Sequence, residues 1–392
     1  MIVGFSIRGF KSLVNFSLDA PQGLNAFTCL VGLNGAGKSS VLQVLDFTSH
    51  VMRGDIDAWL LKRGWSVSDL HSKLTSGSNI IVGVSVRFAD GKLGSWVASF
   101  NRVNLNCTYE RVLVGTEDIF SLNRGKYSSG SGETIKVEFN YTGSILSALK
   151  DEVLGPRIIE IRELISNIRS LELLSPHLMR YSPRDAASDI GTGGEKLAPF
   201  LYGIKGADRK KLVDLLRCFY PAVVDFKVKQ ERAGWKKLLI VEEFNGQQVE
   251  TESKHVNDGL LRILAILAQS SFGKSMLLFD EIENGINPEV VEQLVQVLQN
   301  TGQQVLVTTH SPMILNYLSD EVAKASVHLV YRSFNGGTRS RLLFSSPRMA
   351  EKLKIMGPGE AFVDTSLTEI SSEFSLYDEA EFENAKVSSG SK

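Results

Sequence analysis

GLNGAGKSS, residues 32–40, decides the fold of this chain. It follows the apolar stretch AFTCLV, residues 26–31, which predicts a buried strand, and it precedes VLQVL, where apolar residues recur at helical spacing. The stretch matches the pattern G-x-x-x-x-G-K-[ST]. Glycines let such a loop turn tightly so that backbone N–H groups face phosphate oxygens, and the start of the next helix adds a field that favours negative charge. A phosphate site is therefore a better interpretation than a chance glycine-rich turn.

A second motif, SMLLFDEIENGINP at residues 275–288, places two acids directly after an apolar strand. Buried acids are costly unless they have a role at the strand end, although solvated acids that merely cap a strand are the simpler alternative. Beside a phosphate loop, Asp280 is expected to hold the hydration shell of Mg²⁺, with Ser39 supplying a hydroxyl to the ion. Glu281 is expected to orient or deprotonate the attacking water, and Lys38 to contact the β- and γ-phosphates.

A third motif, QVLVTTHSP at residues 304–312, is another apolar strand with a histidine at its end. In open α/β sheets, ligands collect at the carboxyl ends of the strands. His310 is therefore expected to reach the same crevice as Lys38 and Asp280, where it would sense the γ-phosphate and help to position the water. A purely structural histidine is the alternative.

Composition restricts the class of protein. The 392 residues include 43 basic and 44 acidic residues, so any nucleic-acid groove must be local. Cys29, Cys107 and Cys218 lie far apart with no CxxC pair, which disfavours disulfides and a zinc site and favours a reducing compartment. No apolar run is long enough for a signal peptide or a membrane span, so we expect a cytoplasmic protein.

Hydrophobic periodicity predicts four segments along the chain. Residues 1–143 contain the phosphate loop and a β-rich, antiparallel layer, and residues 144–220 are helical and predict a compact insertion. Residues 221–345 alternate buried strands with helices, which favours a largely parallel sheet. Residues 346–392 form a C-terminal segment whose residues 364–385 contain seven acids and no Lys or Arg, and this predicts a flexible acidic tail.

The order of these motifs resembles that of the ABC-type ATPases, in the branch that includes the SMC, RecF and overcoming-lysogenization-defect (OLD) proteins. The resemblance covers roughly residues 1–45 and 180–345. It implies an α/β fold like an SMC head, with a mixed sheet, a β-rich N-terminal layer and a compact helical insertion, and it implies ATP and Mg²⁺ as cofactors. IRGFKS, residues 7–12, is similar to the first-strand motif of this branch, which implies that Lys11 and Ser12 contact nucleotide.

The resemblance also gives a role to VNDGLLR, residues 256–262, which lies where these ATPases carry a signature segment. That segment opens a helix and contacts the γ-phosphate held by the opposite protomer; here Asn257 stands where Ser is usual. Asn257 or Asp258 is also a favourable helix N-cap, and both roles can hold at once. The full set of expected nucleotide contacts is Lys11, Ser12, Gly32, Asn34, Gly35, Ala36, Gly37, Lys38, Ser39, Ser40, Asn257, Asp258 and Gly259.

The resemblance implies one function and leaves two alternatives open. It implies a molecular switch in which a homodimer or higher homo-oligomer closes around ATP. The 47 residues after position 345 are too few for the Toprim nuclease of OLD proteins, so a separate nuclease or toxin effector is expected, as in bacterial anti-phage systems. The alternatives are a RecF-like DNA maintenance ATPase and an ATP-dependent scaffold with little turnover. Residues that could contact DNA are Arg157, Arg162, Arg169, Arg180, Arg184, Lys205, Arg209, Lys210 and Lys211.

Overall fold

The computed structural model describes residues 1–18, 23–130, 132–181, 183–184, 187, 189–272 and 276–389, with side chains described as far as residue 381. These residues form two units. Unit 1 consists of residues 1–168 and 306–392, and unit 2 consists of residues 169–305. Strand β15 (Gln304–Thr308) runs across the boundary between them.

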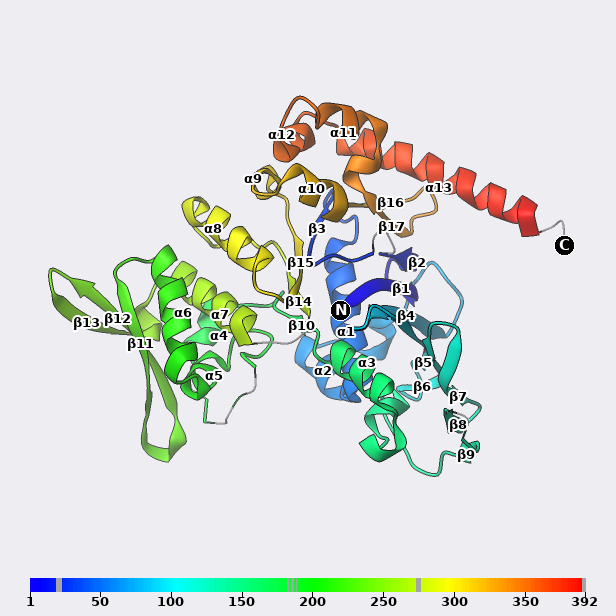
Figure 1. Cartoon of the computed structure of the whole chain (residues 1–392), viewed down its shortest axis with the longest axis horizontal. Helices are drawn as coiled ribbons and strands as arrows, with labels where there is room; N and C mark the ends of the chain where they lie inside the picture. The colour runs from blue at the N-terminus through cyan, green and yellow to red at the C-terminus, as the bar shows by residue number, and fades with distance from the viewer. Residues whose placement is uncertain are drawn as a thin grey trace. The chain divides into compact units, whose positions relative to one another are not determined.

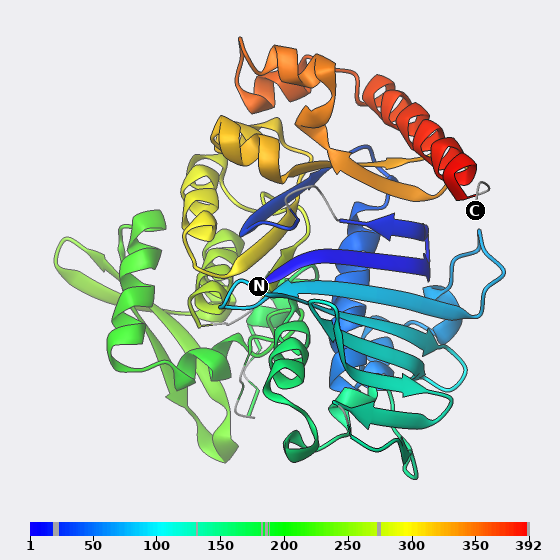
Figure 2. The same cartoon turned by 45° about the vertical axis from the view of Figure 1, so that its right-hand side comes forward.

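An antiparallel sheet of eight strands forms one half of unit 1, in the order β2-β1-β4-β5-β6-β7-β8-β9 (Figure 2). Its strands are β1 (Ile2–Phe10), β2 (Leu13–Ser17), β4 (Asn79–Arg87), β5 (Leu93–Asn101), β6 (Asn106–Val114), β7 (Glu117–Asn123), β8 (Lys126–Ser129) and β9 (Ile135–Lys136). Residues alternate between buried and exposed along β4 and β5, as expected when one face of a sheet is covered. The β-rich N-terminal layer predicted from the sequence is present.

The phosphate-loop region belongs to a second sheet of unit 1. Strand β3 (Phe27–Val31) is buried along its whole length; β15 lies beside it on one side and β16 (Val327–Arg332) on the other, parallel to β3. The last strand, β17 (Thr338–Leu342), pairs antiparallel with β16, so the sheet is mixed, as the resemblance implied. Complete burial of β3 explains why its sequence is continuously apolar rather than alternating.

Helices cover these sheets. They are α1 (Lys38–Arg53), α2 (Ile56–Arg63), α3 (Pro156–Ser166), α9 (Pro312–Asn316), α10 (Asp320–Ser326), α11 (Pro347–Lys352), α12 (Pro358–Val363) and α13 (Leu367–Ser389) (Figure 1). Phe47 of α1 packs against Phe10 of β1, with ring centroids 5.5 Å apart, and against Phe100 of β5 at 5.2 Å. These aromatic contacts hold the helix that follows the phosphate loop against the antiparallel sheet.

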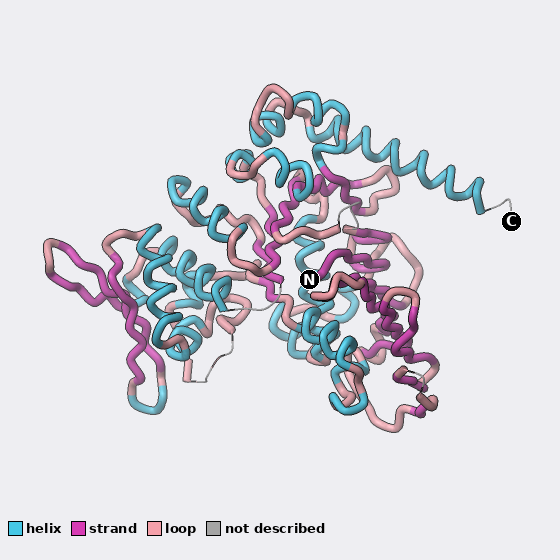
Figure 3. The backbone as a smooth tube through the Cα atoms, in the orientation of Figure 1, coloured by secondary structure: helices cyan, strands magenta, loops and turns pink. Residues whose placement is uncertain are grey.

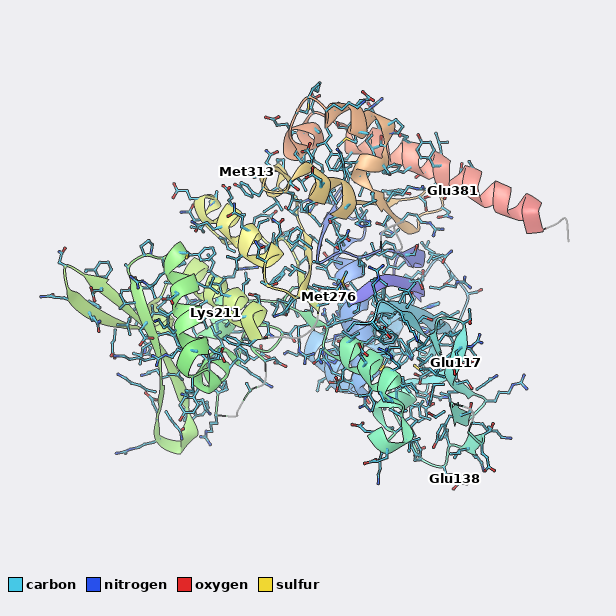
Figure 4. The ribbon with its side chains drawn as sticks, viewed as in Figure 1. Glu117, Glu138, Lys211, Met276, Met313 and Glu381 are labelled. Atoms are coloured by element: carbon cyan, nitrogen blue, oxygen red, sulfur yellow. The ribbon has the colours of Figure 1, made fainter. Side chains whose placement is uncertain are left out.

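Unit 2 combines a small antiparallel sheet with helices (Figure 3). The sheet has the order β11 (Val223–Gln230), β12 (Lys236–Phe244) and β13 (Gln247–Glu252). The helices are α4 (Pro176–Met179), α5 (Leu197–Gly203), α6 (Gly206–Phe219), α7 (Asp258–Phe272) and α8 (Pro288–Gln299). Two short parallel strands, β10 (Arg169–Ser170) and β14 (Met276–Phe279), complete the unit. Figure 4 marks Met276 at the start of β14 and Lys211 on α6.

The unit boundaries differ from those predicted. Residues 144–168 do not belong to a separate insertion, because α3 packs on α1 and Arg53 of α1 donates to Ser166 O at 2.7 Å and to Ile168 O at 2.8 Å. Helices α4, α5 and α6 instead pack with α7 and the β11–β13 sheet in unit 2. Residues 306–345, predicted as part of the second lobe, return to unit 1. Helical periodicity identifies a helix but does not reveal which sheet it covers.

The segment predicted as a flexible tail forms α13, and the first half of this helix packs on unit 1. Ile370 and Phe374 of α13 are fully buried, and the Phe374 ring lies 5.8 Å from that of Tyr331 in β16. Asp378 accepts hydrogen bonds from the Tyr331 hydroxyl at 2.7 Å and from Arg341 Nη2 at 2.7 Å. The tail was predicted to be flexible because the partners of its acids lie on other elements, including β16, β17 and α11, which sequence periodicity does not reveal. Among the described residues, no helix combines the length and apolar character that crossing a membrane requires.

Candidate nucleotide-binding site

The backbone of residues 32–38 has the conformation that a phosphate-binding loop requires. Gly32, Gly35 and Gly37 have φ angles of 150°, 76° and 113°, in the region that side chains rarely adopt. Helix α1 starts immediately after Gly37, so its first N–H groups open onto the loop. The sixteen-residue helix also ends in a left-handed glycine, Gly54, whose N–H bonds to His50 O and Val51 O. The loop therefore combines exposed backbone donors with a helix N-terminus.

Lys38 lies inside the loop. Its side chain is only 6% exposed, and its ammonium donates to Gly32 O at 2.9 Å and to Leu33 O at 3.3 Å. Asn34, Gly35 and Ser39 are exposed on the rim of the loop. A nearly buried ammonium bonded to the loop's own carbonyls can exchange these acceptors for phosphate oxygens, which carry more negative charge. The hydrogen-bond donors of the loop fit the phosphates of a nucleoside triphosphate.

Two residues of the β16–β17 hairpin hold the loop from behind, and the sequence motifs gave no sign of either. Arg332 Nε donates to Gly35 O at 3.0 Å, and Thr338 Oγ1 lies 2.9 Å from Ala36 O. Thr338 is completely buried. A Cβ added to Gly37 would lie 2.4 Å from Thr338 Oγ1, so this glycine is required by packing as well as by its φ angle.

Lys11 and Ser12 lie beside the loop, on the turn between β1 and β2. Lys11 has a left-handed backbone, with φ of 46°. Its ammonium donates to the side chain of Gln43 on α1 at 2.8 Å and lies 3.4 Å from the centroid of the Trp65 ring. Ser12 Oγ lies 2.9 Å from Thr338 Oγ1. The structure therefore brings the predicted first-strand contacts to the edge of the phosphate loop.

His310 is also in unit 1, two residues beyond β15. The preceding residue, Thr309, donates its N–H to Leu30 O of β3 at 3.2 Å, and Thr309 Oγ1 accepts from Ser311 N at 2.9 Å. His310 is exposed. Because β3 leads directly into the phosphate loop, this bond places His310 at the same edge of the sheet as Gly32.

The predicted acids lie in unit 2, directly after β14. All four residues of β14 are buried, whereas Asp280 and Glu281 are partly exposed at its carboxyl end. Glu281 has a left-handed backbone, with φ of 45°, a conformation that is unfavourable for residues other than glycine and that is found preferentially at functional sites. Asn284 bonds to it twice, through N–H to Glu281 O at 2.8 Å and through Nδ2 to Glu281 Oε2 at 3.5 Å.

Arg262 is a residue of this region that sequence reasoning missed. Burial lowers the pKa of its guanidinium, and the nearby charge of Glu281 acts in the opposite direction. A Cβ at Gly285 would lie 3.7 Å from Arg262 Nη1, which places this arginine against the loop that follows β14. A basic residue three positions after Gly259 on α7 was the available sequence signal.

The stretch VNDGLLR opens α7, and Asn257 acts as its N-cap. Asn257 Oδ1 accepts from the N–H of Leu260 at 2.7 Å. Asp258 accepts from Arg180 Nη2 at 2.6 Å, in a salt bridge within unit 2. A Cβ on Gly259 would lie 3.1 Å from the Tyr220 hydroxyl and 3.4 Å from Gly285 O. The segment that resembles a signature therefore packs closely against the loop that follows Asp280 and Glu281.

Each unit thus gathers one part of the predicted site. Unit 1 brings together the phosphate loop, the turn at Lys11 and Ser12, and His310. Unit 2 brings together Asp280 and Glu281 with the start of α7. A cavity of about 770 Å³ elsewhere in unit 1, between the β16–β17 hairpin and α13, contains none of the predicted nucleotide contacts in its lining.

Comparison with known proteins identifies the fold. The family described as "AAA domain, putative AbiEii toxin, Type IV TA system" matches residues 137–316. A crystal structure of an SMC head bound to the C-winged helix domain of ScpA matches with a TM-score of 0.54 and 16% identity, over 90% of this chain and 99% of that chain. The chain has the fold of an SMC head. This result confirms the fold class that the resemblance implied.

Two further solved structures were found to be similar. An SMC head domain with a coiled coil and joint from Pyrococcus yayanosii matches with a TM-score of 0.50 and 10% identity, over 90% of this chain and 99% of that chain. A structure of the recombination mediator protein RecF has a TM-score of 0.43 and 13% identity, over 87% of this chain and 98% of that chain. No curated protein matches the chain in sequence.

Proposed function

We propose that this protein is an ATP-binding and ATP-hydrolysing molecular switch that closes as a dimer or higher oligomer around ATP and thereby controls a separate effector protein. The observation that carries the proposal is the phosphate loop: three glycines with positive φ, a nearly buried Lys38 and the N-terminus of α1. This combination of backbone donors and one ammonium suits the β- and γ-phosphates of a nucleotide.

The remaining catalytic roles go to residues at strand ends. Glu281 is proposed to orient and deprotonate the attacking water, and Asn284, bonded to its carboxylate, would help to fix its position. Ser39 and Asp280 would hold Mg²⁺, since hydroxyl and carboxylate oxygens are its preferred ligands. The ion would neutralise charge that develops on the phosphates. His310 would contact the γ-phosphate from the end of β15.

Closure between two copies is proposed from α7. The helix begins at Asp258, and Asn257 supplies a side-chain amide at its N-terminus. This amide has a donor end as well as the oxygen that caps the helix, so capping and a contact with a γ-phosphate in the other copy are compatible. ATP bound preferentially by the paired state would shift the population toward it.

Two similarities support control of a separate effector. The family that matches residues 137–316 is described as a putative AbiEii toxin of a type IV toxin–antitoxin system. The matching SMC head is bound to a domain of another protein, ScpA. We therefore propose a role in bacterial anti-phage defence with a nuclease or toxin partner. A genetic test is phage infection of cells that carry the intact locus or its Lys38→Ala version.

A RecF-like role in direct DNA binding is the second candidate, and ion pairing disfavours it. Five of the arginines proposed from sequence for DNA contact already pair with acids of the same unit. The pairs are Arg157–Asp90 at 2.5 Å, Arg162–Asp151 at 2.6 Å, Arg169–Asp189 at 3.7 Å, Arg180–Asp258 at 2.6 Å and Arg209–Asp225 at 2.6 Å. Guanidinium groups paired in this way release fewer counterions from DNA. Strong, steeply salt-dependent DNA binding by the isolated protein would reverse this preference.

One pair of variants tests the switch. Glu281→Gln preserves the shape of the side chain but removes its basicity, so it is expected to abolish turnover while ATP and Mg²⁺ drive a stable increase in molecular mass, measured by light scattering. Lys38→Ala is expected to abolish nucleotide binding and to remain at its starting mass. An unchanged mass for Glu281→Gln with ATP bound would refute closure. Equal turnover by the wild type and Glu281→Gln would refute the catalytic role. Negligible turnover by the wild type itself would favour the ATP-dependent scaffold.

A further inference from the structure

The β16–β17 hairpin contacts the phosphate loop at successive points along the loop. Behind its first residue, a Cβ added to Gly32 would lie 2.2 Å from Val330 O. In its middle, Arg332 Nε donates to Gly35 O at 3.0 Å, and Arg332 Nη1 also donates to Gly336 O at 2.8 Å in the turn of the hairpin. At its end, Thr338 contacts Ala36 O. The hairpin therefore follows the loop closely from one end to the other.

Thr338 makes the most enclosed of these contacts. Its side chain is completely buried, and Oγ1 lies 2.9 Å from Ala36 O and 2.9 Å from Ser12 Oγ. A hydroxyl has one proton, so donation to the carbonyl leaves an oxygen lone pair that accepts from Ser12. The backbone N–H of Thr338 also donates to Ser12 O at 2.9 Å. One threonine thus joins the phosphate loop to the turn between β1 and β2.

We propose that the β16–β17 hairpin positions the phosphate loop for nucleotide, with Thr338 as the positioning residue and Arg332 as a second anchor. This inference rests on the proposed ATP function and assigns no direct contact with nucleotide to Thr338. Its hydroxyl fixes the Ala36 carbonyl, and the peptide plane that carries this carbonyl also carries the N–H of Gly37. Fixing the carbonyl on the hairpin side therefore aims that N–H to the opposite side, where phosphate oxygens would bind.

Thr338→Val tests this role because valine has nearly the shape of threonine but lacks the hydroxyl. It leaves the Ala36 carbonyl and Ser12 without their shared partner, so the loop loses its fixed orientation. We expect the Kd for ATP with Mg²⁺ to rise about tenfold, which corresponds to about 1.4 kcal/mol. Once ATP is saturating, kcat is expected to change less than about threefold, because the loss is one of binding geometry. Thr338→Ser restores the hydroxyl and is expected to restore most of the affinity.

Thr28→Val is the matched control. Thr28 lies in β3, in the same sheet, and is 1% exposed. Its Oγ1 is buried with no hydrogen-bond partner in the described part of the chain. The same change of residue type therefore removes a hydroxyl that holds nothing, and ATP affinity is expected to match the wild type. Arg332→Met is a second test variant. Because Arg332 is exposed, its substitution is expected to leave the fold intact. The loss of its two hydrogen bonds is expected to weaken ATP binding threefold to fivefold, by estimate.

The experiment is isothermal titration of each folded variant with ATP and Mg²⁺, with thermal unfolding to verify the fold. Weakened binding by Thr338→Val and Arg332→Met, with normal binding by Thr28→Val and Thr338→Ser, supports the role of the hairpin. Wild-type affinity in both Thr338→Val and Arg332→Met overturns that role but leaves the ATP function in place. Failure of the wild type itself to bind ATP overturns the proposed function, and the inference with it. If Thr338→Val does not fold, Arg332→Met decides.

Discussion

Glu110 in β6 is a buried carboxyl group whose ionisation should make the stability of unit 1 depend on pH. The side chain is completely buried. Its Oε2 accepts from Trp96 Nε1 at 2.9 Å and from Ser144 Oγ at 2.5 Å, and its Oε1 accepts from Ile145 N at 2.7 Å. Burial raises the pKa of Glu110 from 4.5 to about 7, and the three hydrogen bonds oppose this rise only in part.

The sign and size of the effect follow from this pKa. Between pH 4.5 and about pH 7 the folded protein retains a proton that the unfolded chain has lost, so stability falls as pH rises through this window and levels off above it. Linkage between the two pKa values gives a loss on the order of 2–3 kcal/mol between pH 5 and pH 8. Glu110→Gln cannot ionise, and its single carbonyl oxygen cannot serve three donors. This variant should therefore be less stable than the wild type at pH 5, and the deficit should shrink by roughly 2–3 kcal/mol at pH 8.

Urea unfolding followed by tryptophan fluorescence at pH 5, 6, 7 and 8 measures this difference. Comparing the variant with the wild type at each pH cancels the contributions of all other titrating groups. Glu117→Gln, at an exposed position of β7 (labelled in Figure 4), is the control and should differ from the wild type by the same small amount at every pH. A deficit of Glu110→Gln that stays constant within about 0.5 kcal/mol from pH 5 to pH 8 would show that Glu110 does not titrate in this window.

Three further predictions concern the site and the last helix. Gly37→Ala should weaken ATP binding at least tenfold, by estimate, because the new Cβ meets Thr338 and the φ angle of 113° is unfavourable for alanine. The fold should be preserved. Titration with ATP measures the loss, and wild-type affinity would contradict the prediction. Asn257→Ala should cost about 1 kcal/mol in unfolding free energy through the lost cap, and if Asn257 also acts in trans, light scattering should show no ATP-driven association although ATP still binds. Asp378→Asn should speed amide exchange in α13 about tenfold in mass-spectrometric measurements, because Tyr331 and Arg341 lose a charged partner; an unchanged rate would mean that other contacts hold the helix.

The phosphate-loop region could be predicted because its parts are contiguous. A buried strand, a glycine loop and a helix at residues 26–45 depend on local rules: apolar continuity, positive φ and helical periodicity. The same reasoning located the β-rich layer, because alternating burial leaves a period of two in the sequence. It also located the strands that precede Asp280 and His310. Their motifs are short, but each combines burial with polar residues at a strand end.

Other parts could not be predicted because they depend on contacts between distant segments. Thr338 and Arg332 lie about 300 residues after the loop they hold, and nothing around them marks a nucleotide site. Arg262 was missed for a related reason, because its proximity to Glu281 arises only when α7 packs beside the loop after β14. The prediction of DNA contact also depended on distant segments, because the sequence does not show which arginines form ion pairs with acids of the same unit.

The sequence by itself determined a phosphate loop and, through the order of its motifs, an α/β fold like an SMC head. A phosphate loop is specified by a few consecutive residues and their conformational freedom. Only the tertiary structure decided how the chain is divided and what supports the loop. The first half of the acidic segment is a packed helix because Ile370 and Phe374 are buried, Phe374 contacts Tyr331 of β16, and Asp378 accepts a hydrogen bond from the guanidinium of Arg341. Burial and ion pairing are properties of neighbours in space, and a linear pattern specifies only neighbours along the chain.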